Sequence, residues 1–343
     1  MRLSTMLDYS KGFKEAADAA ADWESAGLDI CWVAEAYGFD APSQLGYIAA
    51  RTSTMEIGSA ILPIFSRTPA LLAQTAAGLD ALSGGRFILG LGASGPQVIE
   101  GWHGVPYTKP LERTREIIGI CRDVWKRERL VSDGLYQIPL PPGQGTGLGK
   151  ALKLITHPVR DRIPVWVASM GPMNVRMTAE VADGWFPFLY VPERAAEIWG
   201  ADLDAASAAR TAAGLGPLEI AAGGPAFIGE NVEGLRDLAR PMLALYIGGM
   251  GAKGKNFYNT LARRYGYEKE AELIQELYLD GKKDEAAAVV PEELLEKTSL
   301  IGSPGYVADR IAAYKEAGVT VLNVMVFGPT ATATIEQLKG LMD

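Results

Sequence analysis

A repeating alternation of short apolar segments and amphipathic helical segments most constrains the fold of this chain. Residues 11–26 carry apolar side chains at helical spacing, end in Ala26-Gly27 and lead into the apolar segment 28–33. The same order returns where a predicted helix with Val307, Ile311 and Tyr314 on one face ends in Ala317-Gly318 and leads into the apolar segment 319–327. The alternation predicts a parallel sheet. We expect strands over 3–7, 28–33, 55–61, 86–91, 163–168, 184–189, 218–228 and 319–327, and helices over 11–26, 69–82, 111–127, 173–182, 193–213 and 235–246.

Two architectures fit about eight such strand-helix units. Strands buried on both faces read as continuous apolar runs, as 87–89 and 165–167 do. Units closed on themselves give a (β/α)8 barrel, and a doubly wound open sheet is the alternative. Two stretches break the rhythm: 130–162 is rich in proline and glycine turns, and 247–303 is rich in lysine, glutamate and alanine. We interpret both as insertions within a single domain spanning residues 1–343.

Composition excludes several classes of protein. Hydrophobic residues make up 48% of the chain, which is too many for a disordered protein. A formal net charge of −8 argues against general nucleic-acid binding. Two cysteines and two histidines provide neither a disulfide framework nor a histidine-rich metal site, so we expect no metal. The N-terminus lacks a signal-peptide pattern and no apolar run approaches the length of a membrane span, so a soluble, cytoplasmic protein is expected.

Candidate functional residues are sought where the predicted strands end, because a barrel binds its ligands at the carboxyl ends of its strands. We expect these ends at Asp8/Tyr9, Glu35, Ser59/Ala60, Gly92–Gly95, Ser169–Asn174 and Phe188/Tyr190.

The loop at residues 90–95 matches the pattern GxGxxG. A dinucleotide site also needs a helix that starts inside the motif. Pro96 follows directly, and we expect no helix before about Lys109, so a Rossmann site is disfavoured. The glycines are instead predicted to let the backbone approach a flat ligand.

The segment Ser169–Asn174 leaves one predicted strand and opens a helix, with Pro172 in its first turn. Free backbone N–H groups and the helix dipole there would attract an anion. An ordinary strand-to-helix turn is the alternative.

Two residues are candidates for proton transfer. Glu35 follows the apolar segment 30–34, and a carboxylate at that rim is suited to acid–base chemistry. Its alternative roles are an ion pair with a nearby arginine or simple solvation. His103 lies on a predicted loop, where a histidine is either a proton donor or a structural hydrogen-bonding group. The remaining histidine, His157, precedes a strand at the opposite end of the barrel from the chemistry.

Several segments together resemble the bacterial luciferase-like superfamily: 32–35, 57–63 with 67–69, 82–92, 164–168 and 179–185. Residues 95–104 further resemble the actinobacterial F420-dependent oxidoreductase branch of that superfamily. The matches occur in order across most of the chain, and their combination is more specific than any one of them.

The resemblance implies a (β/α)8 barrel that binds a flavin or the deazaflavin coenzyme F420 at the strand ends, and it implies a homodimer. It also implies a non-prolyl cis peptide at Ser59-Ala60 behind the cofactor ring. Ring and ribityl contacts are implied at Ala93, Ser94 and Gln97, and phosphate contacts around Ser169, Met170, Gly171, Met173 and Asn174. The chain departs from relatives that have Asp-His where it has Glu35-Ala36, so the proton must come from Glu35, His103 or solvent.

Three functions follow from this resemblance. The first is an F420-dependent oxidoreductase that transfers a hydride between the deazaflavin C5 and a small organic substrate. The second is an FMN-dependent monooxygenase, because a short phosphate loop suits either cofactor. The third is a non-catalytic flavin- or deazaflavin-binding protein. A basic rim from Lys109, Arg113, Lys253 or Lys255 would favour the anionic tail of F420. We expect the substrate face to come from 247–303 and 102–107, with Trp102, Tyr107, Phe188 and Tyr190 as aromatic candidates.

Overall fold

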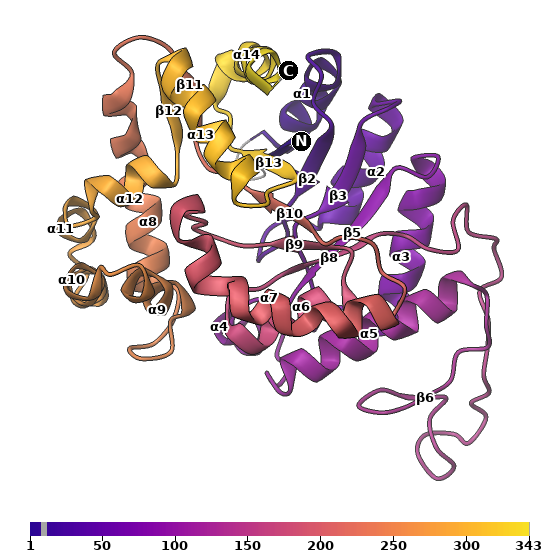
Figure 1. Ribbon diagram of the computed structural model, residues 1–343. Coiled ribbons are helices and arrows are strands. Elements are labelled where there is room, and N and C mark those ends of the chain that lie inside the picture. The colour runs from indigo at the N-terminus through magenta and orange to yellow at the C-terminus, as the bar shows by residue number, and fades with distance from the viewer. Residues whose placement is uncertain (8–11, 343) are drawn as a thin grey trace.

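The computed structural model describes residues 1–7 and 12–342, and its centre is a closed parallel barrel (Figure 1). One nine-stranded sheet closes on itself because β3 also pairs with β5, so β4 (Leu62–Pro63) is a side branch and the other eight strands form the ring. The predicted barrel is confirmed, and the open sheet is excluded. The ring runs through β1 (Arg2–Met6), β2 (Ile30–Val33), β3 (Glu56–Ser59), β5 (Phe87–Gly92), β8 (Val165–Ala168), β9 (Gly184–Phe186), β10 (Glu219–Ala222) and β13 (Val321–Val324).

Helices cover the outer side of the strands (Figure 1). Those predicted from apolar spacing are present as α1 (Phe13–Ser25), α3 (Pro69–Leu82), α5 (Pro110–Trp125), α6 (Pro172–Val181), α7 (Ala195–Ala212) and α13 (Pro304–Glu316). Three further helices were not predicted: α2 (Ala41–Arg51), α4 (Pro96–Gly101) and α14 (Ala331–Met342). The start of α2 does have a sequence signal, since the Asp40 carboxylate accepts a hydrogen bond from the Ser43 N–H at 3.0 Å.

Two predicted elements are wrong in detail. The strand expected over 218–228 divides into β10 and β11 (Ala226–Ile228), and β11 pairs with β12 (Leu300–Gly302) outside the barrel. Gly223 and Gly224 permit this turn, because a Cβ atom on them would lie 2.3 Å from the Asn323 carbonyl and 1.9 Å from the Thr298 carbonyl. The helix expected over 235–246 is a 3-10 segment (Glu233–Ala239), α8 (Arg240–Ala244) and a π-helix (Leu245–Gly249), because Pro241 cannot continue a preceding helix.

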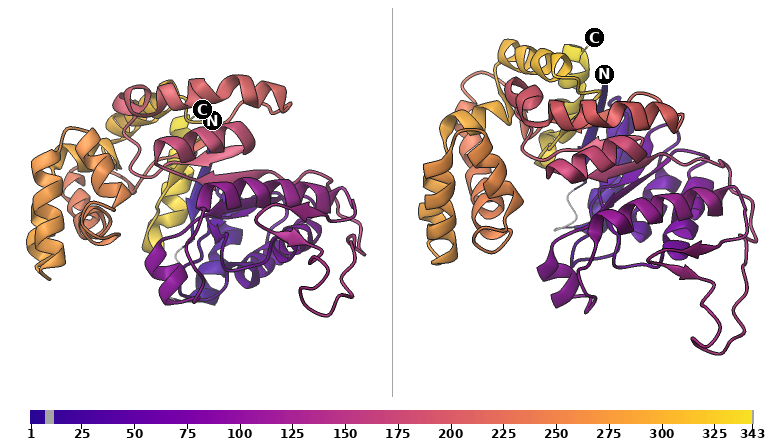
Figure 2. Two further views of the ribbon diagram at one scale, coloured as in Figure 1. Left: turned by 90° about the horizontal axis from the view of Figure 1, so that it is seen from below. Right: turned by 60° about the horizontal axis from the view of Figure 1, so that its bottom comes forward.

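The two irregular stretches lie on opposite sides of the barrel (Figure 2). Residues 130–162 form an excursion whose only paired strands are β6 (Ser132–Asp133) and β7 (Gln137–Ile138). The Glu116 carboxylate on α5 accepts hydrogen bonds from Ser132 and from the Leu135 and Tyr136 N–H groups, which fixes this hairpin. Residues 247–303 carry α9 (Phe257–Arg264), α10 (Glu268–Leu279), α11 (Lys283–Ala288) and α12 (Glu292–Lys297).

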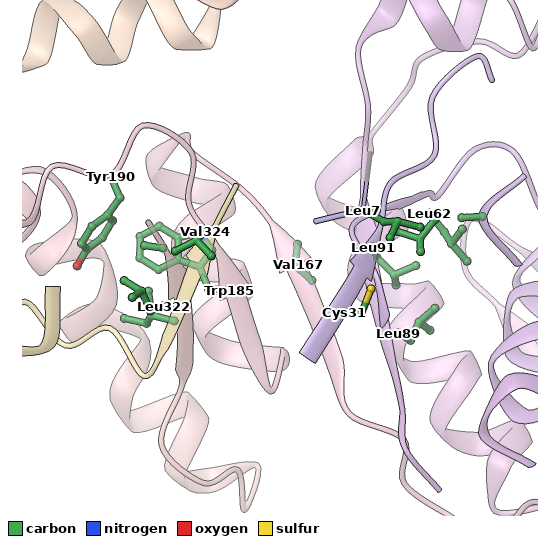
Figure 3. Close-up of a cluster of buried hydrophobic side chains, with 14 of the residues drawn as sticks. Leu7, Cys31, Leu62, Leu89, Leu91, Val167, Trp185, Tyr190, Leu322 and Val324 are labelled. Carbon is green, nitrogen blue, oxygen red and sulfur yellow. The ribbon is translucent and has the colours of Figure 1, made fainter. Parts of the chain in front are cut away.

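The apolar core has two layers. The larger one fills the space between strands and helices, and Figure 3 shows two parts of it on opposite sides of the barrel, around Leu89 and Leu91 and around Trp185 and Leu322. The smaller layer fills the barrel itself, with Ile30, Trp32, Ile88, Trp166, Phe186, Ala221 and Val321. Within the described residues, no helix has both the length and the hydropathy needed to cross a membrane.

Candidate active site

The floor of the candidate site is made by three aromatic side chains inside the barrel. Trp32 lies 5.3 Å from Trp166 and 4.8 Å from Phe186 between ring centroids, and Trp166 lies 5.1 Å from Phe186. Glycines make room for the two indoles, since a Cβ atom would approach Trp32 to 2.2 Å from Gly58 and Trp166 to 2.1 Å from Gly184. Bound molecules therefore have to lie above these rings, at the carboxyl ends of the strands.

The end of β3 holds a non-prolyl cis peptide at Ala60-Ile61, one bond later than the resemblance implied. The predicted position at Ser59-Ala60 is wrong because Ser59 is still held in the sheet. Its hydroxyl donates to the Gly90 carbonyl and accepts from the Gly90 N–H, both at 2.9 Å, and the Ala60 N–H still donates to Val33. Ser59 is fully buried, whereas Ala60 and Ile61 are half-buried against the aromatic floor.

Glycines of β5 make room for the end of β3. A Cβ atom on Gly90 would lie 1.8 Å from the Ser59 carbonyl oxygen, and one on Gly92 would lie 2.3 Å from the Ile61 side chain. These two glycines accommodate the protein's own chain, whereas the sequence analysis assigned that space to a ligand. The helix α4 also begins at Pro96, directly after the motif, so the predicted absence of a helix before Lys109 is wrong. Proline is favoured in a first helical turn, so Pro96 marks the start of α4 and not a break in the chain's helical structure.

Beyond β5, the loop keeps Ala93 and Ser94 half-buried beside the end of β3, and Gln97 is exposed on α4. Ser94 has a φ of 57°, and its carbonyl accepts a hydrogen bond from the Tyr107 hydroxyl at 3.2 Å. Burial raises the pKa of that phenol. Tyr107 also packs on Phe65 with ring centroids 5.1 Å apart. These contacts of Tyr107 therefore fix the position of the loop that follows β5.

The turn between β8 and α6 has features of an anion site. Gly171 precedes α6 without any side-chain cap, and Pro172 has no N–H, so the N–H groups of Met173 and Asn174 lie in the first turn. The Asn174 Oδ1 atom is buried without a hydrogen-bond partner among the described residues. An unpaired amide oxygen suits a hydrogen-bond donor, such as a hydroxyl, on a bound molecule, whereas an anion would be held by the N–H groups of the first turn. Met170 is half-buried beside this turn, and Met173 is exposed.

Ser169 has a more internal position than a direct ligand contact requires. It is 5% exposed, its hydroxyl lies 2.9 Å from the Thr178 hydroxyl, and its carbonyl accepts from the Trp185 indole at 2.8 Å. These bonds fix the turn from below and so support the geometry of Gly171 and Asn174.

Glu35 forms a two-point ion pair with Arg67, the arginine partner that the sequence analysis considered as its alternative role. Its two carboxylate oxygens accept from the Arg67 guanidinium at 2.5 and 2.8 Å, and one of them also accepts from the Ala41 N–H at 2.9 Å. The Glu35 side chain is 8% exposed and that of Arg67 is 14% exposed. Arg67 belongs to the family-like segment 67–69, but the sequence did not identify it as the partner of Glu35, because the two residues are far apart along the chain.

His103 lies just beyond α4, where its backbone N–H donates to the Val98 carbonyl at 3.2 Å. Its ring Nε2 atom is buried and has no hydrogen-bond partner in the part of the chain that the structure describes. Within the described residues, His103 therefore makes no structural hydrogen bond through Nε2. His157 contacts Arg127 on the excursion instead.

The insertion 247–303 reaches the ends of two neighbouring barrel strands. Phe257 lies beside Gly171, which follows β8: a Cβ atom on Gly171 would lie 3.8 Å from the Phe257 ring. Phe188, after β9, packs against Tyr246 at 4.3 Å and Tyr258 at 5.3 Å between ring centroids. Burial and the neighbouring Tyr246 raise the pKa of Tyr258. Phe188 was predicted from the sequence, whereas Tyr246 and Tyr258 were not, because no local pattern links them to the strand ends.

The predicted aromatic and basic groups are only partly brought together. Tyr190 is a core residue that stacks on Trp199 at 5.2 Å, away from Trp102 and Tyr107. Arg113 lies over the Phe65 and Tyr136 rings, and Lys253 pairs with Glu276, so these two cations lie on separate elements. Asp8 and Tyr9 lie outside the described residues. No cluster of three potential metal ligands occurs within the described ranges.

Comparisons with known proteins agree with this architecture. The family model for luciferase-like monooxygenases matches residues 1–321. A putative coenzyme F420-dependent oxidoreductase of Mycobacterium tuberculosis is 41% identical over 329 residues, 94% of each chain. The 5,10-methylenetetrahydromethanopterin reductase of Archaeoglobus fulgidus is 26% identical over 307 residues, 87% of this chain and 85% of the relative. Among solved structures, the coenzyme F420 dependent tetrahydromethanopterin reductase from Methanopyrus kandleri superposes with a TM-score of 0.81 at 21% identity, covering 98% of this chain and 96% of that one.

Proposed function

This chain belongs to the luciferase-like monooxygenase family, and we propose that it is an oxidoreductase that uses coenzyme F420 to transfer a hydride to or from a small organic substrate. The observation that carries this proposal is the match along nearly the whole chain to a mycobacterial protein named as an F420-dependent oxidoreductase. We further propose that residues 1–343 act as one domain, with both irregular stretches as insertions.

The residues at the barrel mouth fit such a cofactor. Ala60 and Ile61 would support the deazaflavin ring above the aromatic floor, with Ser59 fixed behind them. Ala93, Ser94 and Gln97 would contact the ring and its ribityl chain from the β5 side. Met170, Gly171, Met173 and Asn174 would bind the phosphate, with Ser169 fixing that turn. The uncapped helix start supports this assignment, because its free N–H groups can donate to a phosphate, and the unpaired Asn174 oxygen can accept from a hydroxyl of the same molecule.

When bound, reduced F420 supplies the hydride. The chain then has to orient the substrate, exclude water and handle one proton. We propose His103 as the residue that carries the proton, because its buried Nε2 has no protein partner among the described residues. Glu35 remains a candidate for the same role, but both its oxygens are engaged. Its ion pair with Arg67 supports a positioning role for the β2 loop.

The alternative is that the chain is a monooxygenase that uses FMN and O₂. Its membership of a family of luciferase-like monooxygenases supports this alternative. A phosphate-binding helix start accepts either cofactor. Titration of the purified protein with F420 and separately with FMN, followed by cofactor fluorescence, distinguishes them. We expect micromolar or tighter binding of F420 and weak binding of FMN. Preference for FMN would support the monooxygenase, and binding of neither would refute the site.

Tight F420 binding alone also fits a non-catalytic carrier. The protein should therefore be mixed with reduced F420 and a panel of ketones, aldehydes and activated alkenes, and the return of the oxidised cofactor absorbance followed. Oxidation that depends on both protein and acceptor supports the enzyme. Binding without oxidation by any acceptor would favour the carrier.

We also propose a homodimer that works in the cytoplasm. Four large apolar side chains on the excursion, Leu140, Leu148, Leu152 and Ile155, are 56–93% exposed, and a second copy would cover them. Both cysteines are free and buried, which suits a reducing compartment. Light scattering coupled to gel filtration should give twice the chain mass, and a single chain mass would refute the dimer.

A further inference from the structure

Three large aromatic side chains are exposed on the rim of the barrel mouth. Tyr37 and Trp102 are each 67% exposed and Phe39 is 70% exposed. The rings of Tyr37 and Trp102 are 6.4 Å apart between centroids although they belong to different loops. Keeping such a group in water forfeits the free energy that aromatic burial normally provides, and exposed apolar groups of this kind mark binding surfaces.

The topology places this aromatic rim (Tyr37, Phe39 and Trp102) next to the candidate site. Tyr37 follows β2 and Trp102 follows β5 and α4, and the strand between β2 and β5 in the barrel is β3. The Tyr37–Trp102 contact therefore spans the end of β3, where Ala60 and Ile61 lie.

Both loops are anchored at their bases. The β2 loop is fixed by the Glu35–Arg67 ion pair and by the Ala41 N–H bond to Glu35. The other loop is fixed by backbone bonds from Trp102 and His103 to Val98 and by the Tyr107 bond to Ser94. The exposed rings are thus presented by a defined framework.

The barrel interior leaves a bound substrate little room below the site. Trp32, Trp166 and Phe186 are buried and pack against one another across the barrel. Any part of a substrate beyond its reacting group must therefore extend outward, past the loops at the strand ends, and the aromatic rim is the most exposed apolar part of these loops near Ala60 and Ile61.

We propose that the aromatic rim binds the apolar body of the substrate, and that the substrate class is a carbonyl compound or activated alkene bearing an alkyl chain or flat ring. The proposal deepens the proposed function and rests on it for the identity of the reacting group. Tyr37, Phe39 and Trp102 are then specificity-determining residues: they contact the unreactive part of the substrate, and the reacting carbon lies over Ala60 and Ile61.

Trp102 provides a reporter that needs no turnover. The chain has seven tryptophans, all in the described part, and the other six are buried. Acrylamide therefore quenches mainly Trp102. The quenching constant should be measured with a series of methyl ketones from 2-butanone to 2-undecanone, with and without saturating F420. Longer ketones should protect Trp102, and each methylene that is buried at the rim should tighten binding by roughly fourfold.

A Tyr37→Ala/Phe39→Ala double variant keeps the reporter and removes most of the rim. We expect it to bind 2-undecanone no more tightly than 2-butanone while its F420 affinity stays as in the wild type. Trp102→Phe identifies the quenched signal. Leu82→Ala is the matched control, because Leu82 is 69% exposed at the last residue of α3, at the opposite end of the barrel.

The outcomes separate the two proposals. If long ketones bind without protecting Trp102, bind equally to the double variant, or do not bind, the rim proposal is wrong even when F420 binds. If F420 does not bind but long ketones protect Trp102, the proposed cofactor fails and the rim site stands.

Discussion

Glu35 and Arg67 form a two-point ion pair at the barrel mouth, with hydrogen bonds of 2.5 and 2.8 Å. Glu35 follows β2 and Arg67 follows β4, so the pair ties the loop that carries Tyr37 to the segment that follows Ala60 and Ile61. A change in this pair should therefore disturb the geometry of both the ring support and the aromatic rim.

The substitution Glu35→Gln should lower turnover much more than it lowers F420 affinity. It leaves Arg67 without a counter-charge at a site that is mostly buried, which should also cost roughly 2 kcal/mol of folding free energy. Urea unfolding, F420 titration and turnover measure the three effects, and Arg67→Lys should give a smaller loss of each. A variant with wild-type turnover would remove Glu35 from the mechanism. A reduced rate with an unchanged pH profile would identify Glu35 as a positioning residue.

Replacing His103 by alanine should reduce turnover by about 10²-fold, the typical contribution of a general acid or base. F420 binding should stay unchanged, since the ring nitrogen has no partner in the described protein to lose. Added imidazole should restore part of the rate. His157→Ala, on the excursion, serves as the control. Equal rates for His103→Ala and the wild type would exclude His103 as the proton carrier.

Asn174→Ala should have opposite effects on stability and binding. Removing an unpaired buried amide from the first turn of α6 should stabilise the free protein by about 1 kcal/mol. The same change should weaken F420 binding by about tenfold, because it removes the side-chain NH2 group, the part of the amide that can donate a charge-assisted hydrogen bond to a phosphate oxygen. The phosphate-free riboside of the deazaflavin ring should bind both proteins equally. A loss of affinity for the riboside as well would place Asn174 at the ring and contradict its assignment to the phosphate.

Gly90→Ala should destabilise the protein by roughly 3 kcal/mol or more, because the new methyl group would overlap the Ser59 carbonyl. Gly78→Ala, in α3 with open space around it, should instead stabilise by about 0.5–1 kcal/mol. Thermal unfolding of the two variants measures the contrast. Similar melting temperatures would mean that β3 and β5 are less closely fitted than the structure indicates.

Stability should decline in alkali partly through Tyr190. Burial raises the pKa of this phenol to about 12 from an ordinary value of 10.0. A raised folded-state pKa means that its contribution is fully present below pH 10 and is lost between pH 10 and 12. The loss should reach about 1.4 kcal/mol at pH 11. Tyr190→Phe lacks this ionisation, so its urea-unfolding free energy should fall less between pH 8 and pH 11. An equal fall in both proteins would assign the alkaline loss to other groups.

Local pattern and family resemblance predicted much of the barrel, because the alternation of strands and helices depends on residues that are close together in the sequence. The spacing of Pro69–Leu82 gives the helix α3 at the predicted bounds. Patterns failed where distant residues decide. Gly223 and Gly224 lie within a segment whose pattern predicts one continuous strand. The carbonyls of Asn323 and Thr298, far along the chain, occupy the space that a side chain at these two positions would need.

The same reasoning explains the candidate site. Glu35, Ser59 and Asn174 stand at strand or helix ends that the sequence locates, so their region could be predicted, whereas the helix before His103 was not predicted. The position of the cis peptide could not, because Ser59 is held by bonds to Gly90 across the sheet. Phe257 and Tyr258 reach the mouth through the folding of the insertion, and Tyr246 reaches it from the helical segment just before the insertion.

The aromatic floor formed by Trp32, Trp166 and Phe186 should change more slowly in evolution than the aromatic rim. Each indole depends on a glycine in the neighbouring strand, so a change in the floor requires coordinated changes at Gly58 or Gly184. Tyr37, Phe39 and Trp102 are instead 67–70% exposed, so a substitution at one of them disturbs less packed structure than a substitution in the barrel interior. Descendants of this chain should therefore acquire new substrates through single substitutions at the rim, while the platform that supports the chemistry is inherited unchanged.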